Sequence, residues 1–126
     1  MVARVVPVEP FDLVVFGATG DLARRKLIPA LYHRLRAGQM PDGARVIGAA
    51  RSAMDADGFR RLAEEALAEF VPAAERDAET TDRFLRALDY VAVDATGEDG
   101  WPELRAHLPE DAARPRAFYL SVAPKL

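Results

Sequence analysis

The stretch Phe11-Asp12-Leu13-Val14-Val15-Phe16-Gly17-Ala18-Thr19-Gly20-Asp21-Leu22-Ala23 decides the expected fold. Its apolar run from Leu13 to Phe16 is typical of a strand buried on both faces of a parallel sheet. Two glycines follow at once, and apolar residues then recur at helical spacing in Leu27, Ile28, Leu31 and Leu35. The pattern predicts a strand over 12–17, a tight turn, and a helix over 20–37 that continues through Pro29 with a kink.

The turn between this strand and this helix is suited to bind a phosphate. Gly17 can adopt the positive φ of a tight turn, and Gly20 has no Cβ to hold a pyrophosphate away from the backbone. Gly20 and Asp21 are expected at the helix N-terminus, where unpaired N–H groups and a partial positive charge attract anions. The spacing is G-x-x-G-x-x-A, ending at Ala23, rather than G-x-G-x-x-G. A turn that binds nothing would show the same pattern, so this motif alone decides no function.

Three further strand patterns follow along the chain, at 45–50, 90–93 and 117–123. Amphipathic stretches separate them: Phe59 to Phe70 with Asp55 or Asp57 as cap, a shorter helix holding Phe84, Leu85 and Leu88 with Thr80 or Thr81 as cap, and a helix with Trp101, Leu104 and Leu108. We expect the tryptophan to pack rather than to bind a ligand. Right-handed crossovers make this β-α-β-α-β-α-β order a Rossmann-like α/β fold, with a parallel sheet of strand order 3-2-1-4.

Residues 1–10 show no clear period and are interpreted as a leader, and residues 11–126 as one domain. We expect that domain to be incomplete, with its sheet truncated after the fourth strand. A parallel sheet of this kind binds ligands at the carboxyl ends of its strands, next to the switch point between the first and fourth. Four parts of the chain are all predicted at those ends: Gly17 to Asp21, Arg51, Asp94 and the segment after Val122.

Arg51 and Ser52 follow the second strand and favour NADP. A carboxylate at this position accepts a hydrogen bond from the 2′-hydroxyl of NAD, whereas an arginine can pair with the 2′-phosphate of NADP. After this strand, no acidic residue occurs before Asp55. A solvated arginine at a strand end would give the same sequence, so the interpretation depends on the glycine turn beside it.

Composition and charge exclude several classes of function. The net charge of −3, from 17 basic and 20 acidic residues, indicates no nucleic-acid or membrane-surface partner. The absence of cysteine excludes disulfides and thiolate chemistry, and His33 and His107 alone leave little for a metal site. No uncharged run approaches the length of about 18 residues that a membrane span needs, and residues 1–10 lack a signal-peptide pattern. We expect a cytoplasmic protein.

Three segments resemble the N-terminal part of the glucose-6-phosphate dehydrogenase family: Phe16 to Tyr32, Ile47 to Ser52 and Phe118 to Pro124. The run G-x-x-G-D-L-A-x-x-K is specific to that family, and the resemblance continues in register from Phe11 onward. It implies an oxidoreductase of the pentose phosphate pathway, which oxidises glucose 6-phosphate to 6-phosphogluconolactone and passes hydride to NADP.

The resemblance also implies site residues. The coenzyme phosphate loop would consist of Gly17, Ala18, Thr19, Gly20, Asp21 and Leu22; Arg51 and Ser52 would hold the 2′-phosphate; Asp94 and Ala95 would contact the adenosine side; and Lys26 would face the substrate end of the cleft. The carboxylate of Asp21 would repel a phosphate. We therefore expect its side chain to turn back to N–H groups of the loop, stabilised by the helix end and by Arg24 and Arg25 nearby.

The family's substrate motif, D-H-Y-L-G-K, does not occur in these 126 residues. We expect this chain alone to bind NADP without turnover and to hold no catalytic residue, and we expect the enzyme to be a homo-oligomer. An exposed edge of the fourth strand predicts self-association of the chain. Two other functions stay open: a noncatalytic NADP-binding or sensing module, and a short-chain-type NADP reductase, although the Y-x-x-x-K pair of the latter is absent.

Overall fold

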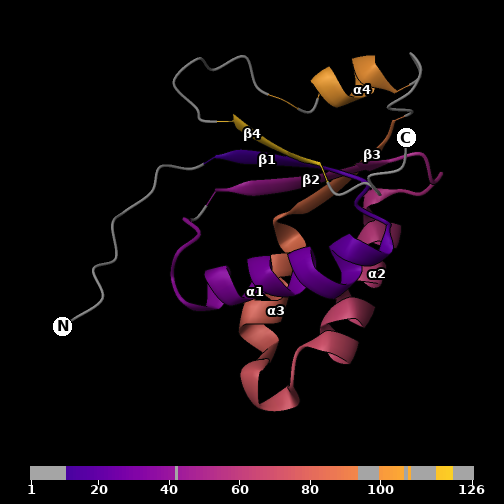
Figure 1. Cartoon of the computed structure of the whole chain (residues 1–126). Helices are drawn as coiled ribbons and strands as arrows, with labels where there is room; N and C mark the ends of the chain where they lie inside the picture. Colours follow the sequence, from indigo (N-terminus) through magenta and orange to yellow (C-terminus); the bar gives the residue numbers. More distant parts are fainter. Residues whose placement is uncertain (1–10, 42, 94–99, 107, 109–115, 121–126) are drawn as a thin grey trace.

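The computed structural model describes residues 11–41, 43–93, 100–106, 108 and 116–120. Within them, four parallel strands form a sheet of order β3-β2-β1-β4 (Figure 1). The strands are β1 (Asp12–Phe16), β2 (Arg45–Ala50), β3 (Leu88–Ala92) and β4 (Arg116–Leu120). Asp12 lies opposite both Arg45 and Arg116 in the sheet register. The predicted α/β class and strand order are confirmed.

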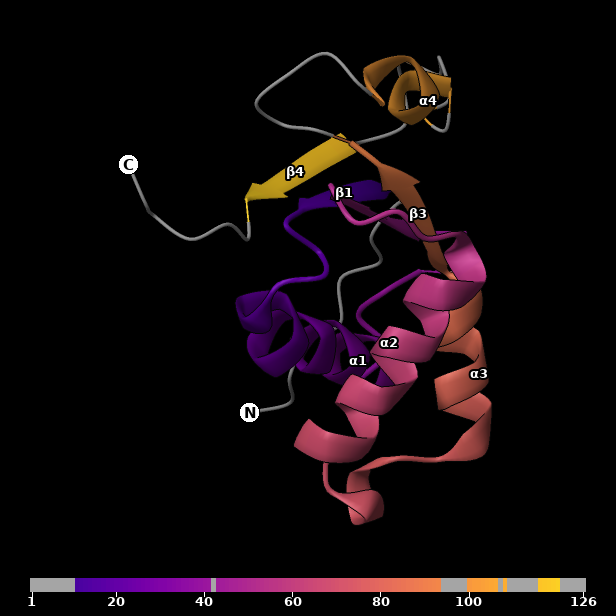
Figure 2. The same ribbon diagram turned by 90° about the vertical axis from the view of Figure 1, so that its right-hand side faces the viewer.

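Helices lie on both faces of the sheet. The helices α1 (Ile28–Arg36), α2 (Ala56–Phe70) and α3 (Ala78–Arg86) cover one face, and α4 (Trp101–Ala106) lies over the other (Figures 1 and 2). We call these the three-helix face and the α4 face. Successive residues of a strand point to opposite faces, so Val15 packs in the core of the three-helix face while Val14 and Phe16 pack on the α4 face.

The first helix continues through Pro29 by means of a π-helical segment. The chain becomes helical at Asp21, is π-helical over Ala23–Leu27 and continues as α1. The N–H of Ile28 bonds to the carbonyl of Ala23, five residues earlier. This wider turn lies directly before Pro29, which has no N–H to donate. The irregularity expected as a kink therefore takes the form of a π-helical turn.

Aspartates cap the next two helices. The side chain of Asp55 accepts a hydrogen bond from the N–H of Gly58 at 2.7 Å, so it, and not Asp57, caps α2. Asp77 accepts from the N–H of Thr80 at 2.7 Å and caps α3. The prediction that Thr80 or Thr81 caps this helix is wrong. The carboxylate lies three residues earlier, where it reaches an N–H that has no acceptor within the helix.

Some predicted boundaries shift by a few residues. The strand β3 begins at Leu88, which was predicted in the preceding helix, and β4 begins at Arg116. The remainder of the predicted fourth strand, residues 121–123, lies outside the described residues, as do the predicted leader 1–10 and His107. Between α2 and α3 a short 3-10 helix covers Ala73–Glu75.

An ion pair between a buried aspartate and a part-exposed arginine joins β1 and β2 on the α4 face. The Nε of Arg45 donates to Oδ1 of Asp12 at 3.1 Å, and the side chain of Asp12 is 1% exposed. Trp101 of α4 covers the same face, with its ring centroid 5.7 Å from that of Phe16. The predicted packing role of the tryptophan is confirmed.

Candidate functional site

The turn at 17–22 leaves the carboxyl end of β1 and is tied to the end of β2. Gly17 has φ of +77°, the positive value predicted for it. The carbonyl of Ala49 accepts from the N–H of Gly17 at 2.8 Å and, at 3.4 Å, from that of Ala18. The N–H of Gly20 closes the turn on the carbonyl of Gly17 at 3.0 Å. These three N–H groups therefore hold the shape of the turn.

Three other N–H groups of the turn are available to a ligand. Within the described part of the chain, those of Thr19, Asp21 and Leu22 have no hydrogen-bond acceptor. Asp21 and Leu22 lie in the first turn of the helix, where the aligned backbone dipoles leave a partial positive charge. Free donors and a positive helix end together form a site for an anion such as phosphate.

The carboxylate of Asp21 pairs with Arg25 and leaves the loop donors free. The Nε of Arg25 donates to Oδ1 of Asp21 at 2.9 Å, with both side chains exposed. The prediction that this carboxylate turns back to loop N–H groups is wrong, because a guanidinium one helical turn later takes it. Arg24 instead pairs with Glu69 of α2 at 3.6 Å. The Arg25 charge thus offsets the negative charge beside the anion site.

Arg51 and Ser52 lie beside the turn. Oγ1 of Thr19 and Oγ of Ser52 are 3.3 Å apart, which joins two parts of the predicted site that are 33 residues apart in sequence. Arg51 is exposed, and no carboxylate of the described residues pairs with it. An unpaired guanidinium next to an anion-binding turn can hold a second phosphate by charge-assisted hydrogen bonds.

The missing side chain of Gly48 in β2 leaves room for Ala18 of the turn and for Phe59 of the core. A Cβ at this position would lie 2.7 Å from Cζ of Phe59 in α2 and 3.0 Å from Cβ of Ala18 in the turn. Both distances are shorter than ordinary van der Waals contact, so a side chain here would displace one of the two neighbours. Sequence analysis assigned Gly48 to a strand without this role, because the contact depends on how α2 packs under β2.

Tyr90 of β3 is a residue of the site that sequence analysis missed. Its hydroxyl donates to the carbonyl of Ser52 at 2.7 Å and lies 3.1 Å from that of Ala50. Burial raises the pKa of Tyr90, so the hydroxyl keeps its proton and remains a donor. A signal was present in the sequence, since a tyrosine on a buried strand needs a hydrogen-bond partner for its hydroxyl.

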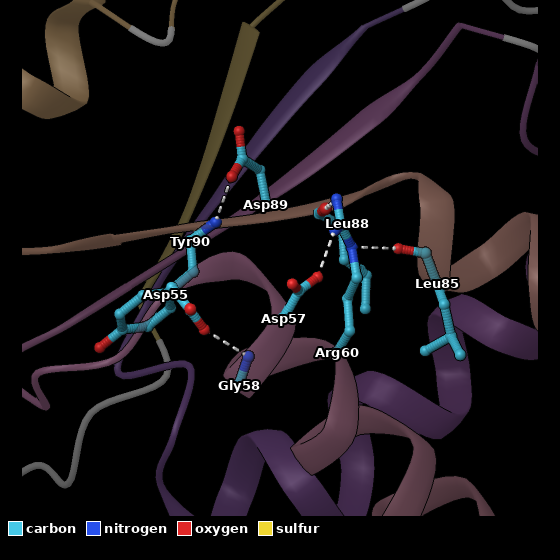
Figure 3. A network of polar contacts seen from close by, with 8 residues as sticks. All are labelled: Asp55, Asp57, Gly58, Arg60, Leu85, Leu88, Asp89 and Tyr90. Carbon is cyan, nitrogen blue, oxygen red and sulfur yellow. Dashed lines mark hydrogen bonds and ion pairs between the residues drawn. The ribbon is translucent and has the colours of Figure 1, made fainter.

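Arg60 anchors α2 to the chain that leads into β3 (Figure 3). Its guanidinium donates to the carbonyls of Leu85 at 3.0 Å and Leu88 at 2.9 Å, and to Asp57 at 3.1 Å. Three elements are therefore joined by one side chain: α2, the end of α3 and the start of β3. Arg60 thereby fixes α2. Phe59 of this helix supports Tyr90 on the three-helix face, where their ring centroids are 5.4 Å apart.

The remaining predicted site residues are Lys26, Asp94 and Ala95. Lys26 lies in the π-helical segment, is exposed, and has no ionic partner among the residues that the structure describes. Asp94 and Ala95 lie outside the described residues. In the described ranges, no group of histidine and carboxylate side chains is arranged to hold a metal ion. Nor does any helix there have the length and apolar character to cross a membrane.

Comparison with known proteins identifies the family. The domain described as "Glucose-6-phosphate dehydrogenase, NAD binding domain" matches residues 14–126. This chain belongs to that family. Glucose-6-phosphate 1-dehydrogenase of Rhizobium meliloti (strain 1021) is 48% identical over 126 residues, which cover 100% of this chain and 26% of that protein. The corresponding protein of Gluconobacter oxydans (strain 621H) is 47% identical over 121 residues, covering 94% and 25%.

Solved structures of glucose-6-phosphate dehydrogenases share the fold. One, in complex with its substrate glucose-6-phosphate, has a TM-score of 0.79 and 27% identity over 98% of this chain and 26% of that chain. The Mycobacterium avium protein has a TM-score of 0.79 and 31% identity over 91% and 24%. The chain thus spans about a quarter of the length of these relatives. The family resemblance is confirmed, and residues 14–126 belong to the family's nicotinamide-coenzyme domain.

Proposed function

We propose that this chain is the NADP-binding part of an enzyme that oxidises glucose 6-phosphate to 6-phosphogluconolactone. The observation that carries the proposal is the meeting of an anion-binding turn with Arg51, which pairs with no carboxylate of the described residues. The two meet at the carboxyl ends of the strands, through the 3.3 Å contact of Thr19 with Ser52. Family membership supports a nicotinamide coenzyme, and Arg51 supports its 2′-phosphorylated form.

In this proposal the N–H groups of Thr19, Asp21 and Leu22 bind the coenzyme pyrophosphate at the helix N-terminus. Gly17, Ala18 and Gly20 shape the turn that presents them. The guanidinium of Arg51 and the hydroxyl of Ser52 bind the 2′-phosphate, because both groups can donate to its oxygens. Asp94 and Ala95 contact the adenosine side, and Lys26 faces the substrate end. NADP, when bound, accepts the hydride from the sugar.

The position of the nearest carboxylate also supports NADP over NAD. An NAD site needs a carboxylate at the end of the second strand to accept from the ribose hydroxyls. The first acidic residue after β2 is Asp55, whose Oδ1 accepts from the N–H of Gly58 at 2.7 Å as the cap of α2. The carboxylate that NAD would require is thus bound to the N-terminus of α2. The position directly after β2 is occupied by the cationic side chain of Arg51.

Calorimetric titration of the chain with NADP and with NAD tests the coenzyme. We expect saturable binding of NADP, and an Arg51→Ala variant that weakens it about 10- to 100-fold because charge-assisted hydrogen bonds are lost. Binding of NAD should change by less than about twofold in the same variant. Arg34→Ala, on the exposed face of α1, serves as a matched control that removes a positive charge elsewhere.

Two outcomes of this titration would contradict the proposal at different levels. Absence of binding to either coenzyme would refute a coenzyme site in this chain. Equal binding of NADP and NAD, unchanged in Arg51→Ala, would refute the 2′-phosphate site alone.

Turnover is tested by adding glucose 6-phosphate to a protein as long as the relatives. Coenzyme binding without oxidation there would favour a sensing module.

We also propose that the protein self-associates. Phe118 and Tyr119 of β4, 59% and 41% exposed, lie on the strand at the end of the described sheet order, and an apolar strand edge of this kind pairs readily with another chain. Light scattering at high concentration should give a dimer or larger species, and a clean monomer would contradict this. The cytoplasmic location stays a prediction from the sequence.

A further inference from the structure

The hydroxyl of Tyr90 holds the backbone on both sides of Arg51. It donates to the carbonyl of Ser52 at 2.7 Å and lies 3.1 Å from the carbonyl of Ala50. The Ala50 carbonyl has a second donor, the N–H of Val93 at 2.8 Å. Among the described residues, the carbonyl of Ser52 has no donor other than Tyr90. The far side of the Arg51 turn therefore depends on this hydroxyl.

We propose that Tyr90 is a positioning residue that fixes the Arg51–Ser52 turn and thereby sets the preference for the 2′-phosphorylated coenzyme. This inference rests on the proposed function, since it deepens the role of the same site. Tyr90 acts through the backbone of its neighbours and makes no contact with the coenzyme itself.

The donor is held rigidly by the core. Tyr90 is 5% exposed, and its ring packs 5.4 Å from that of Phe59, which is 2% exposed. Arg51, in contrast, is an exposed side chain. A flexible side chain on a mobile turn would lose conformational freedom of both side chain and backbone when it binds. Fixing the backbone in advance leaves only the side chain to be ordered, which increases affinity for the group that Arg51 recognises.

The same bond orients the second donor of the 2′-phosphate site. The backbone of Ser52 is held by Tyr90, and its hydroxyl lies 3.3 Å from that of Thr19 in the phosphate turn. A continuous series of contacts thus runs from β3 through the turn after β2 to the turn after β1. Loss of the Tyr90 hydroxyl would release Ser52 while Gly17 stays bonded to Ala49 at 2.8 Å. The pyrophosphate turn should therefore persist when the 2′-phosphate turn loosens.

Tyr32 provides a matched control, because it too has a buried hydroxyl, but one whose partners lie outside the candidate site. It is 0% exposed on the same face of the sheet, and its hydroxyl accepts from the N–H of Asp77 at 3.2 Å and lies 3.3 Å from Oγ1 of Thr81. These partners belong to α3 and its cap, not to the turns of the site. Tyr32→Phe and Tyr90→Phe each remove one buried hydroxyl and keep the ring, so they differ mainly in what the hydroxyl holds.

The test is calorimetric titration of the chain and of both variants with NADP and with NAD. We expect Tyr90→Phe to weaken NADP binding about five- to tenfold, which is the effect of one lost hydrogen bond. The affinity for NAD should change by less than about twofold. Tyr32→Phe should leave both affinities unchanged. In an Arg51→Ala background, Tyr90→Phe should weaken NADP binding less than it does in the unmodified chain, because the part of its effect that passes through Arg51 is already lost.

The outcomes separate this inference from the proposed function. Failure of the unmodified chain to bind NADP refutes the proposed function before any variant is measured. If the chain binds NADP and Tyr90→Phe leaves that affinity unchanged, or weakens NADP and NAD equally, the positioning role is refuted. Titrations in trimethylamine N-oxide keep a destabilised variant folded, and circular dichroism of each sample confirms this, so unfolding is not mistaken for lost binding.

Discussion

The two faces of the sheet are built differently, although they share the same strands. On the three-helix face, large aromatic side chains are almost fully enclosed: Tyr32, Phe59 and Phe84 are 0%, 2% and 0% exposed. On the α4 face, a six-residue helix covers a smaller described cluster around Val14 and Ile47 (Figure 2). The candidate site lies at the edge of the sheet, yet the residues that hold it come from the three-helix face. Its integrity should depend mainly on that face.

The largest expected effect is the loss of an aromatic ring from the three-helix face. Phe84→Ala should lower the free energy of unfolding by about 3–5 kcal/mol, because it removes a fully buried ring and leaves a cavity beside Tyr32. Phe118→Ala on β4, where the ring is 59% exposed, should change it by at most about 0.5 kcal/mol. Urea denaturation followed by circular dichroism measures both. Equal losses of unfolding free energy in the two variants would contradict the greater contribution of the three-helix face to stability.

A second prediction concerns the charged group on the α4 face. Asp12→Asn should cost about 2 kcal/mol of unfolding free energy, since it removes the charge that pairs with Arg45 from a buried position. Asp82→Asn is the matched control, because Asp82 pairs with Arg86 on the exposed surface of α3 and such pairs contribute at most about 1 kcal/mol. A smaller loss in Asp12→Asn than in Asp82→Asn would contradict a stabilising role for the pair of Asp12 with Arg45.

A third prediction concerns Gly48, which lies between the core and the phosphate turn. Gly48→Ala should cost about 1–2 kcal/mol by overpacking, because its Cβ would meet the ring of Phe59 and the Cβ of Ala18. Displacement of Ala18 distorts the pyrophosphate turn, which both coenzymes share. NADP and NAD binding should therefore weaken together, unlike the selective effect expected of Tyr90→Phe. Calorimetric titration distinguishes the two, and a selective loss of NADP in Gly48→Ala would contradict this division of roles.

The smallest expected effect is a pH dependence at the cap of α3. The backbone N–H of Thr80 lowers the pKa of Asp77 below its ordinary value of 3.8. Because the carboxyl binds protons more weakly in the folded state, its contribution to stability is complete above that ordinary value and is lost as the pH falls through the folded-state pKa. Asp77→Asn retains a capping oxygen without the charge. Denaturation at pH 7, 4 and 3 should therefore show a shallower decline in the variant, and identical declines would exclude Asp77 as the source.

Most of the fold could be predicted because its signals are local. The apolar run before Gly17, the positive φ that a glycine permits, and the amphipathic stripe of α2 each depend on residues close in sequence. The misassigned cap of α3 was also a local matter, but several adjacent polar side chains could serve, and only geometry selects Asp77. For Asp21, the competition between loop N–H groups and Arg25 was likewise not decided by residue type.

The sequence by itself determined the alternation of strands and helices, the turn at Gly17 and the placement of Arg51 directly after β2, since chain order and backbone preference are enough for these. Only the tertiary structure decided that Thr19 lies 3.3 Å from Ser52, that Gly48 must leave room for Phe59, and that the Tyr90 hydroxyl reaches a carbonyl 38 residues earlier. A buried hydrogen bond takes whichever partner the packed elements bring within about 3 Å. That distance is set by how the strands and α2 pack, not by any single stretch of residues.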